Sequence, residues 1–152
     1  MHIVLVEPEI PGNTGNIARL CAATGAELHL VRPLGFSTDD RYLKRAGLDY
    51  WHLVNVHYHD NYGEAAKSLA GRNFYFNTTK AARFYSDIAF SAEDVLVFGK
   101  ETAGLPEELL AANRDSCIRI PMVGDARSLN LSNAVAIVVY EALRQLNFPA
   151  FQ

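Results

Sequence analysis

Several signatures of common enzyme classes are missing from this sequence of 152 residues. No GxGxxG motif follows the first apolar run and no GxxxxGK[ST] phosphate loop occurs, which argues against ordinary dinucleotide-binding and P-loop proteins. HExxH and GxSxG are absent as well. A small nucleotide-binding hydrolase of doubly wound topology would therefore lack both a phosphate loop and a nucleophile elbow.

Cysteine is scarce, and no metal-binding pattern stands out. Cys21 and Cys117 each lie in an apolar stretch without a CxxC spacing, so we predict two reduced core residues. His57 and His59 form an HxH pair, but no carboxylate or third ligand follows in a clear pattern. His2, His29 and His52 look isolated. The sequence therefore predicts no metal site.

Long hydrophobic runs are also missing. The first apolar run, residues 3–6, ends at Glu7 and has no basic leader before it, so it is too short for a signal or membrane-spanning segment. We expect no membrane association and a cytoplasmic protein. With 49% hydrophobic and 20% charged residues, the chain fits a single globular domain covering residues 1–152.

An overall excess of basic residues is lacking, because the formal net charge is −3. This argues weakly against a generic polyanion binder. Residues 65–86 nevertheless contain four basic residues and no acidic one, and residues 32–45 contain four basic and two acidic ones. These segments are candidates for nucleic-acid binding, and a solvated face is the plain alternative.

Short apolar runs alternate with segments of helical pattern along the chain. The runs are predicted strands, and they cover residues 3–6, 28–31, 53–56, 74–76, 95–98 and 118–120. The predicted helices cover residues 16–24, 62–70, 107–112 and 131–146. This order predicts an α/β fold with a parallel sheet flanked by helices.

Ligands of open parallel sheets bind beyond the carboxyl ends of the strands, so the loops after the runs are candidate sites. After the first run, Asn13 or Thr14 is expected to cap a helix that begins near Asn16. Arg19 would then lie in the first turn, where a cation opposes the helix dipole and suggests a bound anion. An ordinary surface arginine is the alternative.

Two later loops are also rich in glycine and small polar residues. Gly99, Glu101 and Gly104 follow the run at 95–98, and glycines let a ligand approach the backbone closely. Ser128, Asn130, Ser132 and Asn133 precede the last helix. One or two of these four suffice as helix caps, so the group exceeds what one helix start requires.

The last predicted helix has seven consecutive apolar residues at positions 134–140. A helix with one apolar stripe would lie on the surface, whereas this helix needs cover on several sides. A homodimer is the favoured explanation, and burial within a single subunit is the alternative.

Taken in order, NTGNIAR, FGKETAGLP and IPMVGDARSLNLSNAVAIVVYEAL resemble the three motifs of the SPOUT methyltransferase superfamily. The flanking blocks VLVEPEIPGNTGNIARLCAATG, GFSTDDRYLKRAGLDY and FNTTK most resemble its minimal bacterial tRNA wobble-nucleotide 2′-O-methyltransferases. The resemblance spans the chain. It implies a C-terminal deep trefoil knot, a homodimer, and S-adenosylmethionine as methyl donor bound in the knot.

The resemblance also implies site residues. Arg19 matches the catalytic arginine of the first motif, with Asn13, Glu101 and Asn130 as its supporting network. The implied donor-binding residues are Asn77, Thr78, Gly99, Ile120, Met122, Ser128 and Leu129. Candidates for contact with a tRNA anticodon stem-loop are Arg41, Lys44, Arg45, Lys80, Arg83 and Tyr140, of which Tyr140 fits the core equally well.

Two other functions remain compatible with these motifs. A ribose methyltransferase acting on ribosomal RNA would share all of them, and substrate mapping would be needed to separate the two. A non-catalytic module that binds RNA or S-adenosylmethionine is disfavoured, because it would not need Arg19.

Overall fold

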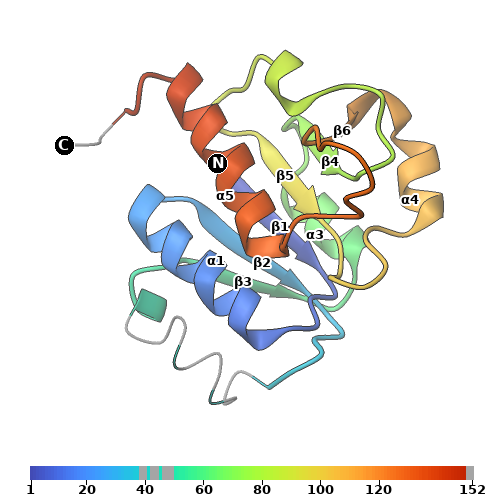
Figure 1. Cartoon of the computed structure of the whole chain (residues 1–152). Helices are drawn as coiled ribbons and strands as arrows, with labels where there is room; N and C mark the ends of the chain where they lie inside the picture. Colours follow the sequence, from blue (N-terminus) through green and yellow to red (C-terminus); the bar gives the residue numbers. More distant parts are fainter. Residues whose placement is uncertain (38–40, 42–44, 46–49, 150–152) are drawn as a thin grey trace.

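The structure is a computed structural model that describes residues 1–37, 41, 45 and 50–149 (Figure 1). Its described residues form a parallel sheet with the strand order β3-β2-β1-β5-β4-β6. The strands are β1 (His2–Val6), β2 (Glu27–Val31), β3 (Val56–His59), β4 (Phe74–Asn77), β5 (Val95–Phe98) and β6 (Cys117–Ile118). This architecture confirms the predicted α/β class.

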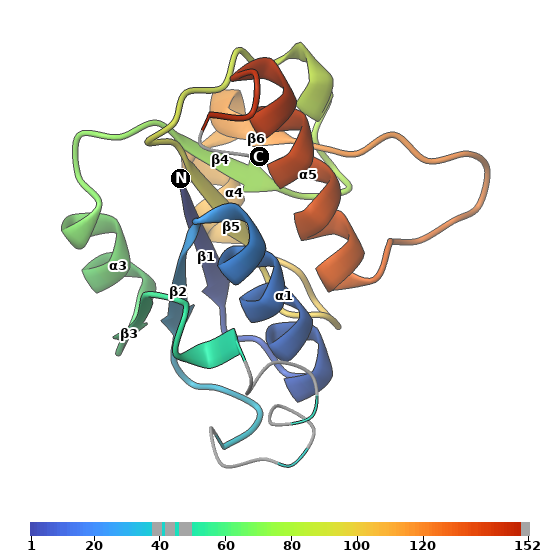
Figure 2. The same ribbon diagram turned by 90° about the vertical axis from the view of Figure 1, so that its left-hand side faces the viewer.

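Helices cover both faces of the sheet. The long helices α1 (Pro11–Thr24) and α5 (Leu131–Gln145) lie side by side on one face, and α3 (Tyr62–Ser68) and α4 (Glu107–Ala112) lie on the other (Figure 2). Two 3₁₀ turns, Tyr85–Asp87 and Arg114–Ser116, lie in the connections. Successive strand residues point to opposite faces: Ile3 and Leu5 pack in the α1 and α5 core, whereas Val4 and Val6 pack toward α3 and α4.

Four of the six predicted strands are confirmed and two are misplaced. The run at 118–120 shares only Ile118 with β6, which begins one residue earlier. The run at residues 95–98 coincides with β5, but the run at 53–56 shares only Val56 with β3. Leu53 is 62% exposed, and the strand continues instead through the polar residues 57–59. Because β3 is an edge strand with a half-exposed face, its apolar pattern is weak and its position was misread.

The start of α1 also differs from the prediction. The helix begins at Pro11, where proline is favoured because the first helical N–H has no partner in the helix. Asn13 and Thr14 are buried inside the first turn and cap nothing. Arg19 is therefore in the third turn, so the argument that it opposes the helix dipole was wrong.

Helix α5 has one buried face and one exposed face. It buries Val135, Val138, Val139, Ala142 and Leu143, while Ile137 and Tyr140 are 36% and 44% exposed. This chain therefore does not bury the helix on several sides, as the alternative of burial within one subunit required. The alternative that Tyr140 lies in the core was also wrong. No helix in the described part of the chain is long and apolar enough to cross a membrane.

The segment that leaves β6 runs between two parts of an earlier loop. On one side, the Thr78 N–H donates to the Ile118 carbonyl (3.0 Å). On the other side, Arg119 forms a parallel bridge with Phe84. The Arg119 N–H donates to the Arg83 carbonyl (2.9 Å), and the Arg119 carbonyl accepts from the Tyr85 N–H (2.9 Å). Residues 78–85 therefore flank this segment on both sides before the chain reaches α5.

Candidate functional site

A cavity of about 560 Å³ lies beyond the carboxyl ends of β4, β5 and β6. Its walls come from residues 77–80, from the loop after β5 and from the segment between β6 and α5. All seven residues expected to bind the methyl donor line this cavity: Asn77, Thr78, Gly99, Ile120, Met122, Ser128 and Leu129. The structure thus brings these residues together, and their role in binding stays a prediction.

The cavity combines an apolar wall with a buried polar atom that has no partner. Leu105, Ile120 and Met122 supply apolar surface. The Asn77 amide nitrogen donates to the Val97 carbonyl (3.3 Å) and, more weakly, to the Tyr75 carbonyl (3.4 Å). The Asn77 Oδ1 atom is buried and has no hydrogen-bond partner among the described residues. Because buried polar atoms are nearly always paired, this oxygen suits a donor group of a ligand.

The structure explains why a glycine is needed at position 99, which the sequence did not reveal. A Cβ at this position would lie 2.1 Å from the Gly104 carbonyl carbon and 2.2 Å from the Leu105 nitrogen. The loop after β5 therefore folds back on Gly99, and the Gly104 N–H closes it by donating to the Lys100 carbonyl (2.8 Å). Gly99 is needed because the chain itself, rather than a ligand, comes close to its backbone.

Glu101 holds the loop after β1 in place. Its carboxylate accepts hydrogen bonds from the Glu9 N–H (2.7 Å), the Ile10 N–H (3.0 Å) and the Asn13 side-chain amide (3.2 Å). In return, the Glu9 carboxylate accepts from the Thr102 N–H (3.1 Å) and from the Thr102 hydroxyl. These reciprocal bonds fasten the first and second motifs to each other at the mouth of the cavity.

Asn130 connects the same network to α5. Its Nδ2 donates to the Asn13 Oδ1 (3.0 Å), and its Oδ1 caps the helix by accepting from the Ser132 N–H (3.0 Å) and the Asn133 N–H (3.4 Å). The hydrogen bonds from Asn13 to Glu101 and from Asn130 to Asn13 thus link all three motifs. This agrees with the expectation that these three residues form one supporting network. Asn130 is the cap and Asn13 is its bridge to Glu101.

Arg19 stands apart from this network. It is exposed on α1, does not line the cavity, and its guanidinium lies over the Tyr50 ring at 4.9 Å. Among the described residues it makes no hydrogen bond to Asn13, Glu101 or Asn130. The expected support of Arg19 by these three residues is therefore not seen within one chain.

The predicted RNA-binding residues are spread over several surfaces. Five of the six are exposed: Arg41, Arg45, Lys80, Arg83 and Tyr140. Lys80 also forms an ion pair with Glu107. The sixth, Lys44, lies outside the described residues. The basic segment 65–86 is divided by the fold. Arg72 lies before β4, beside Glu93 (3.5 Å), while Lys80 and Arg83 follow β4 at the opposite end of the strand.

Sequence reasoning missed two features. Lys100 forms an ion pair with Glu7 (2.7 Å) beside the cavity. The available signal was the segment EPE at residues 7–9, which places two carboxylates directly after the first strand. His2 and His29 are not isolated, because the fold places them against each other and close to His57 and His59.

The fold and site define an α/β protein with a cavity at the carboxyl edge of a parallel sheet, beside a hydrogen-bond network that joins Asn13, Glu101 and Asn130. The chain belongs to the SpoU rRNA methylase family, whose model matches residues 1–140.

Similar proteins carry more specific names. The tRNA (cytidine(34)-2'-O)-methyltransferase of Methylovorus glucosotrophus is 54% identical over 147 residues, which cover 96% of each chain. A solved structure that concerns the 2-OH methylation of C/U34 on tRNA is 46% identical, with a TM-score of 0.92 over 96% of this chain and 95% of that one. The SpoU methyltransferase AviRb from Streptomyces viridochromogenes, solved with the cofactor AdoMet, is 28% identical, with a TM-score of 0.82 over 97% of this chain and 58% of that one.

Proposed function

We propose that this protein is a tRNA (cytidine(34)-2'-O)-methyltransferase that uses S-adenosylmethionine. Relatives of this name match it over nearly the full length of both chains. The observation that carries the proposal is the cavity, because all seven residues expected to bind the donor line it together. They come from the block FNTTK and from the second and third motifs, which are far apart in the chain. Since tRNA decoding takes place in the cytoplasm, we expect the protein to act there.

The cavity fits the methyl donor in size and chemistry. Its volume of about 560 Å³ is that of a small-molecule site. Ile120 and Met122 would pack against the adenine, and the unpaired Asn77 Oδ1 would accept a hydrogen bond from the donor's amino or hydroxyl groups. When bound, the donor supplies an electrophilic methyl group on a sulfonium.

The reaction is a displacement at that methyl carbon. The ribose 2′ oxygen would form a bond to the methyl carbon, the carbon–sulfur bond would break with its electron pair left on sulfur as a neutral thioether, and the hydroxyl proton would pass to solvent water. A ribose hydroxyl is a weak nucleophile at neutral pH, so the site must take the proton or stabilise the developing alkoxide. A guanidinium stays protonated in proteins and is a poor base. Arg19 would therefore clamp an RNA phosphate and stabilise the oxyanion.

Glu101, Asn13 and Asn130 would act by positioning. The Glu101 carboxylate already accepts three hydrogen bonds from the first loop, so its role is to hold this loop against the cavity. Asn130 fixes the start of α5 to the same loop. Together they would hold the loop after β1 and the donor cavity in a fixed position relative to each other, so that the ribose and the methyl group are aligned.

The family implies a trefoil knot, and the path of the chain supports it. The segment after β6 is flanked on both sides by residues 78–85. Further along, the Gln145 side chain of α5 donates to the Ile88 carbonyl (2.9 Å) and accepts from the Phe90 N–H (2.9 Å). A chain that passes through its own earlier loop is a rare exception to the usual topology.

A homodimer would explain two exposed features. The outer face of α5 presents Ile137 and Tyr140, and apolar side chains that recur along one helix face suit a subunit contact. Arg19 is exposed and outside its own cavity, so it would act on a site completed by the second copy. If so, at limiting donor concentration, dimers that combine an Arg19→Ala chain with a Gly99→Ala chain regain part of the activity that dimers of either variant alone lose.

The test is methyl transfer from labelled S-adenosylmethionine to tRNA from a strain that lacks the enzyme, followed by nucleoside mapping. We expect label in the 2′-O-methylated nucleoside at position 34, and none with the Arg19→Ala variant. Label found only in ribosomal RNA would assign the protein to that substrate instead. Donor binding without transfer to either RNA would identify a binding module and overturn the proposal.

A further inference from the structure

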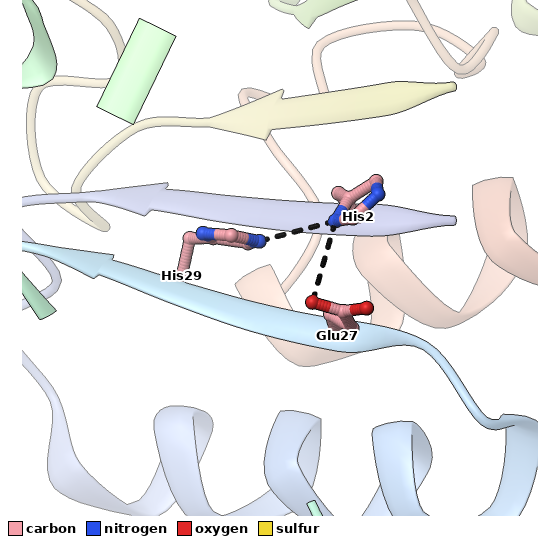
Figure 3. A group of neighbouring side chains, drawn as sticks. All are labelled: His2, Glu27 and His29. Carbon is pink, nitrogen blue, oxygen red and sulfur yellow. Dashed lines mark hydrogen bonds and ion pairs between the residues drawn. The ribbon is translucent and has the colours of Figure 1, made fainter. Parts of the chain in front are cut away.

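Four histidines gather on the face of the sheet that carries α3, far from the cavity. His2 and Glu27 are the first residues of β1 and β2, and the strand register places them side by side. His29 follows two residues after Glu27 on the same face. In the neighbouring strand β3, His57 lies opposite His29 and His59 lies opposite Val31. Figure 3 shows His2 pointing toward both His29 and Glu27.

We propose that His2, Glu27 and His29 form a binding site for a divalent transition metal of the zinc class. The His2 Nδ1 lies 3.2 Å from the His29 Nε2 and 3.8 Å from the Glu27 Oε2, and the three ligand atoms all lie within 4.8 Å of one another. Ligand atoms about 2.0 to 2.1 Å from a tetrahedral zinc ion lie about 3.4 Å apart. A metal ion would replace the proton that the two facing histidine nitrogens now share.

The side chains that contact the three proposed ligands also suit a metal site. Histidine ligands usually direct their second ring nitrogen to a hydrogen-bonding partner, which fixes their orientation. The His29 Nδ1 lies 3.0 Å from the His59 Nε2, and the His2 Nε2 lies 3.6 Å from the Glu93 carboxylate. The Glu27 Oε2 is 2.9 Å from the His57 Nε2.

The protonation state of the two histidines also suits a metal ion. Burial, reinforced by the neighbouring His57, lowers the pKa of His29 to about 3, and burial lowers the pKa of His2 as well, so both rings are neutral at pH 7. Neutral imidazole is the form that binds metals. The carboxylates of Glu27 and Glu93 offset the guanidinium of Arg72 and the amino terminus of the chain, so the charges around the cluster are balanced.

Access and donor type narrow the choice of metal. His2 and His29 are 5% and 3% exposed, whereas the Glu27 side chain is 37% exposed and opens the cluster to solvent. Two imidazoles and one carboxylate suit zinc and its neighbours, while magnesium and calcium prefer oxygen ligands. The ion would join the ends of β1 and β2 and stabilise the fold.

The test uses the full chain without a polyhistidine tag, freed of metal with a chelator. We expect one Zn²⁺ per chain by calorimetry, a higher Tm with Zn²⁺, and the intense visible absorption of four-coordinate Co²⁺ when Co²⁺ is the probe. His29→Gln should abolish these signals, and His59→Gln should weaken binding by about 10- to 100-fold. His52→Gln, at an exposed histidine outside the cluster, is the matched control.

Zn²⁺ binding that is substoichiometric, or that persists unchanged in His29→Gln, would overturn the site. Should His29→Gln fail to fold, Glu27→Gln tests the same ligand set at a half-exposed position. The cysteines do not confuse the result, because both are buried and the pKa of Cys21 is raised by burial to about 12. Since the cluster lies at the amino ends of the strands, methyl transfer at saturating donor and tRNA should be unchanged in Glu27→Gln.

Discussion

Two polar clusters lie at opposite ends of the same sheet and are built differently. The network of Glu101, Asn13 and Asn130 joins three loops at the carboxyl edge and lies beside a cavity. The cluster of His2, Glu27 and His29 comes from neighbouring strands at the amino end, where residues meet through the strand register. The first cluster positions loops that can bind a ligand between them, whereas the side chains of the second project from paired strands whose register fixes their separation.

Replacing Arg19 is expected to have the largest effect. If its guanidinium stabilises the transition state, Arg19→Ala lowers kcat by about 10²- to 10³-fold, as loss of one such donor does in other enzymes. Donor affinity should stay the same, because Arg19 does not line the cavity of its own chain. Steady-state kinetics and donor calorimetry measure the two effects, with Arg114→Ala as an exposed control. Near-normal turnover of Arg19→Lys would contradict a guanidinium-specific role.

Gly99→Ala should damage the carboxyl-edge site alone. The added Cβ would overlap the backbone at Gly104 and Leu105, so the loop must shift, at a cost of about 1 to 3 kcal/mol of unfolding free energy. Donor affinity should fall at least about tenfold, since such a shift costs at least about 1.4 kcal/mol of binding. Urea unfolding and calorimetry measure this. Gly12→Ala, where a Cβ meets nothing within 4 Å, is the control, and equal effects of the two would refute the close-approach argument.

The histidine cluster should make the metal-free protein sensitive to acid. The pKa of His29 is lowered from 6.5 to about 3 by burial and then by His57, His2, His59 and Arg72. Below pH 6.5 the unfolded chain binds a proton that the folded chain does not, so stability falls as pH drops from 6.5 toward 3. The slope from this group is at most about 1.4 kcal/mol per pH unit.

Urea unfolding at several pH values, in the presence of a chelator, measures this slope. Burial also lowers the pKa values of His2 and His59, so these two histidines add to the slope in the same direction as His29. Glu141, with its pKa lowered to about 2 by hydrogen bonds from Arg144 and Gln145, titrates well below the window between pH 6.5 and 5. His29→Gln should reduce the slope, and a stability that is flat over this range would contradict the neutral, buried state of His29.

The smallest expected effect concerns Asn130. Asn130→Ala removes the cap of α5 and should lower the free energy of unfolding by about 1 kcal/mol. Asn130→Asp retains the capping oxygen but loses the bond to Asn13, so it should recover most of the stability and less of the activity. Thermal unfolding and initial rates separate the two roles. Equal recovery of both would show that Asn130 serves as a cap and nothing more.

The site at the carboxyl edge was largely predictable, and the histidine cluster was not. Gly99, Glu101 and Asn130 stand in loops that follow apolar runs, where parallel sheets bind ligands, and the cavity contains all seven expected donor residues. The histidines looked isolated because their contacts depend on which strands are neighbours. The shared spacing of Glu27 with His29 and of His57 with His59 was the available signal, and it gains meaning when β2 and β3 pair in register.

The sequence by itself determined the alternation of strands and helices, the position of β5 and the motifs around the cavity, because apolar periodicity and glycine-rich loops act locally. The tertiary structure alone decided that Gly99 faces the backbone of its own loop, that Arg19 lies outside the cavity, and that His2 meets His29. These three facts depend on contacts between residues far apart in the chain, and such contacts are set by packing and strand order rather than by local pattern.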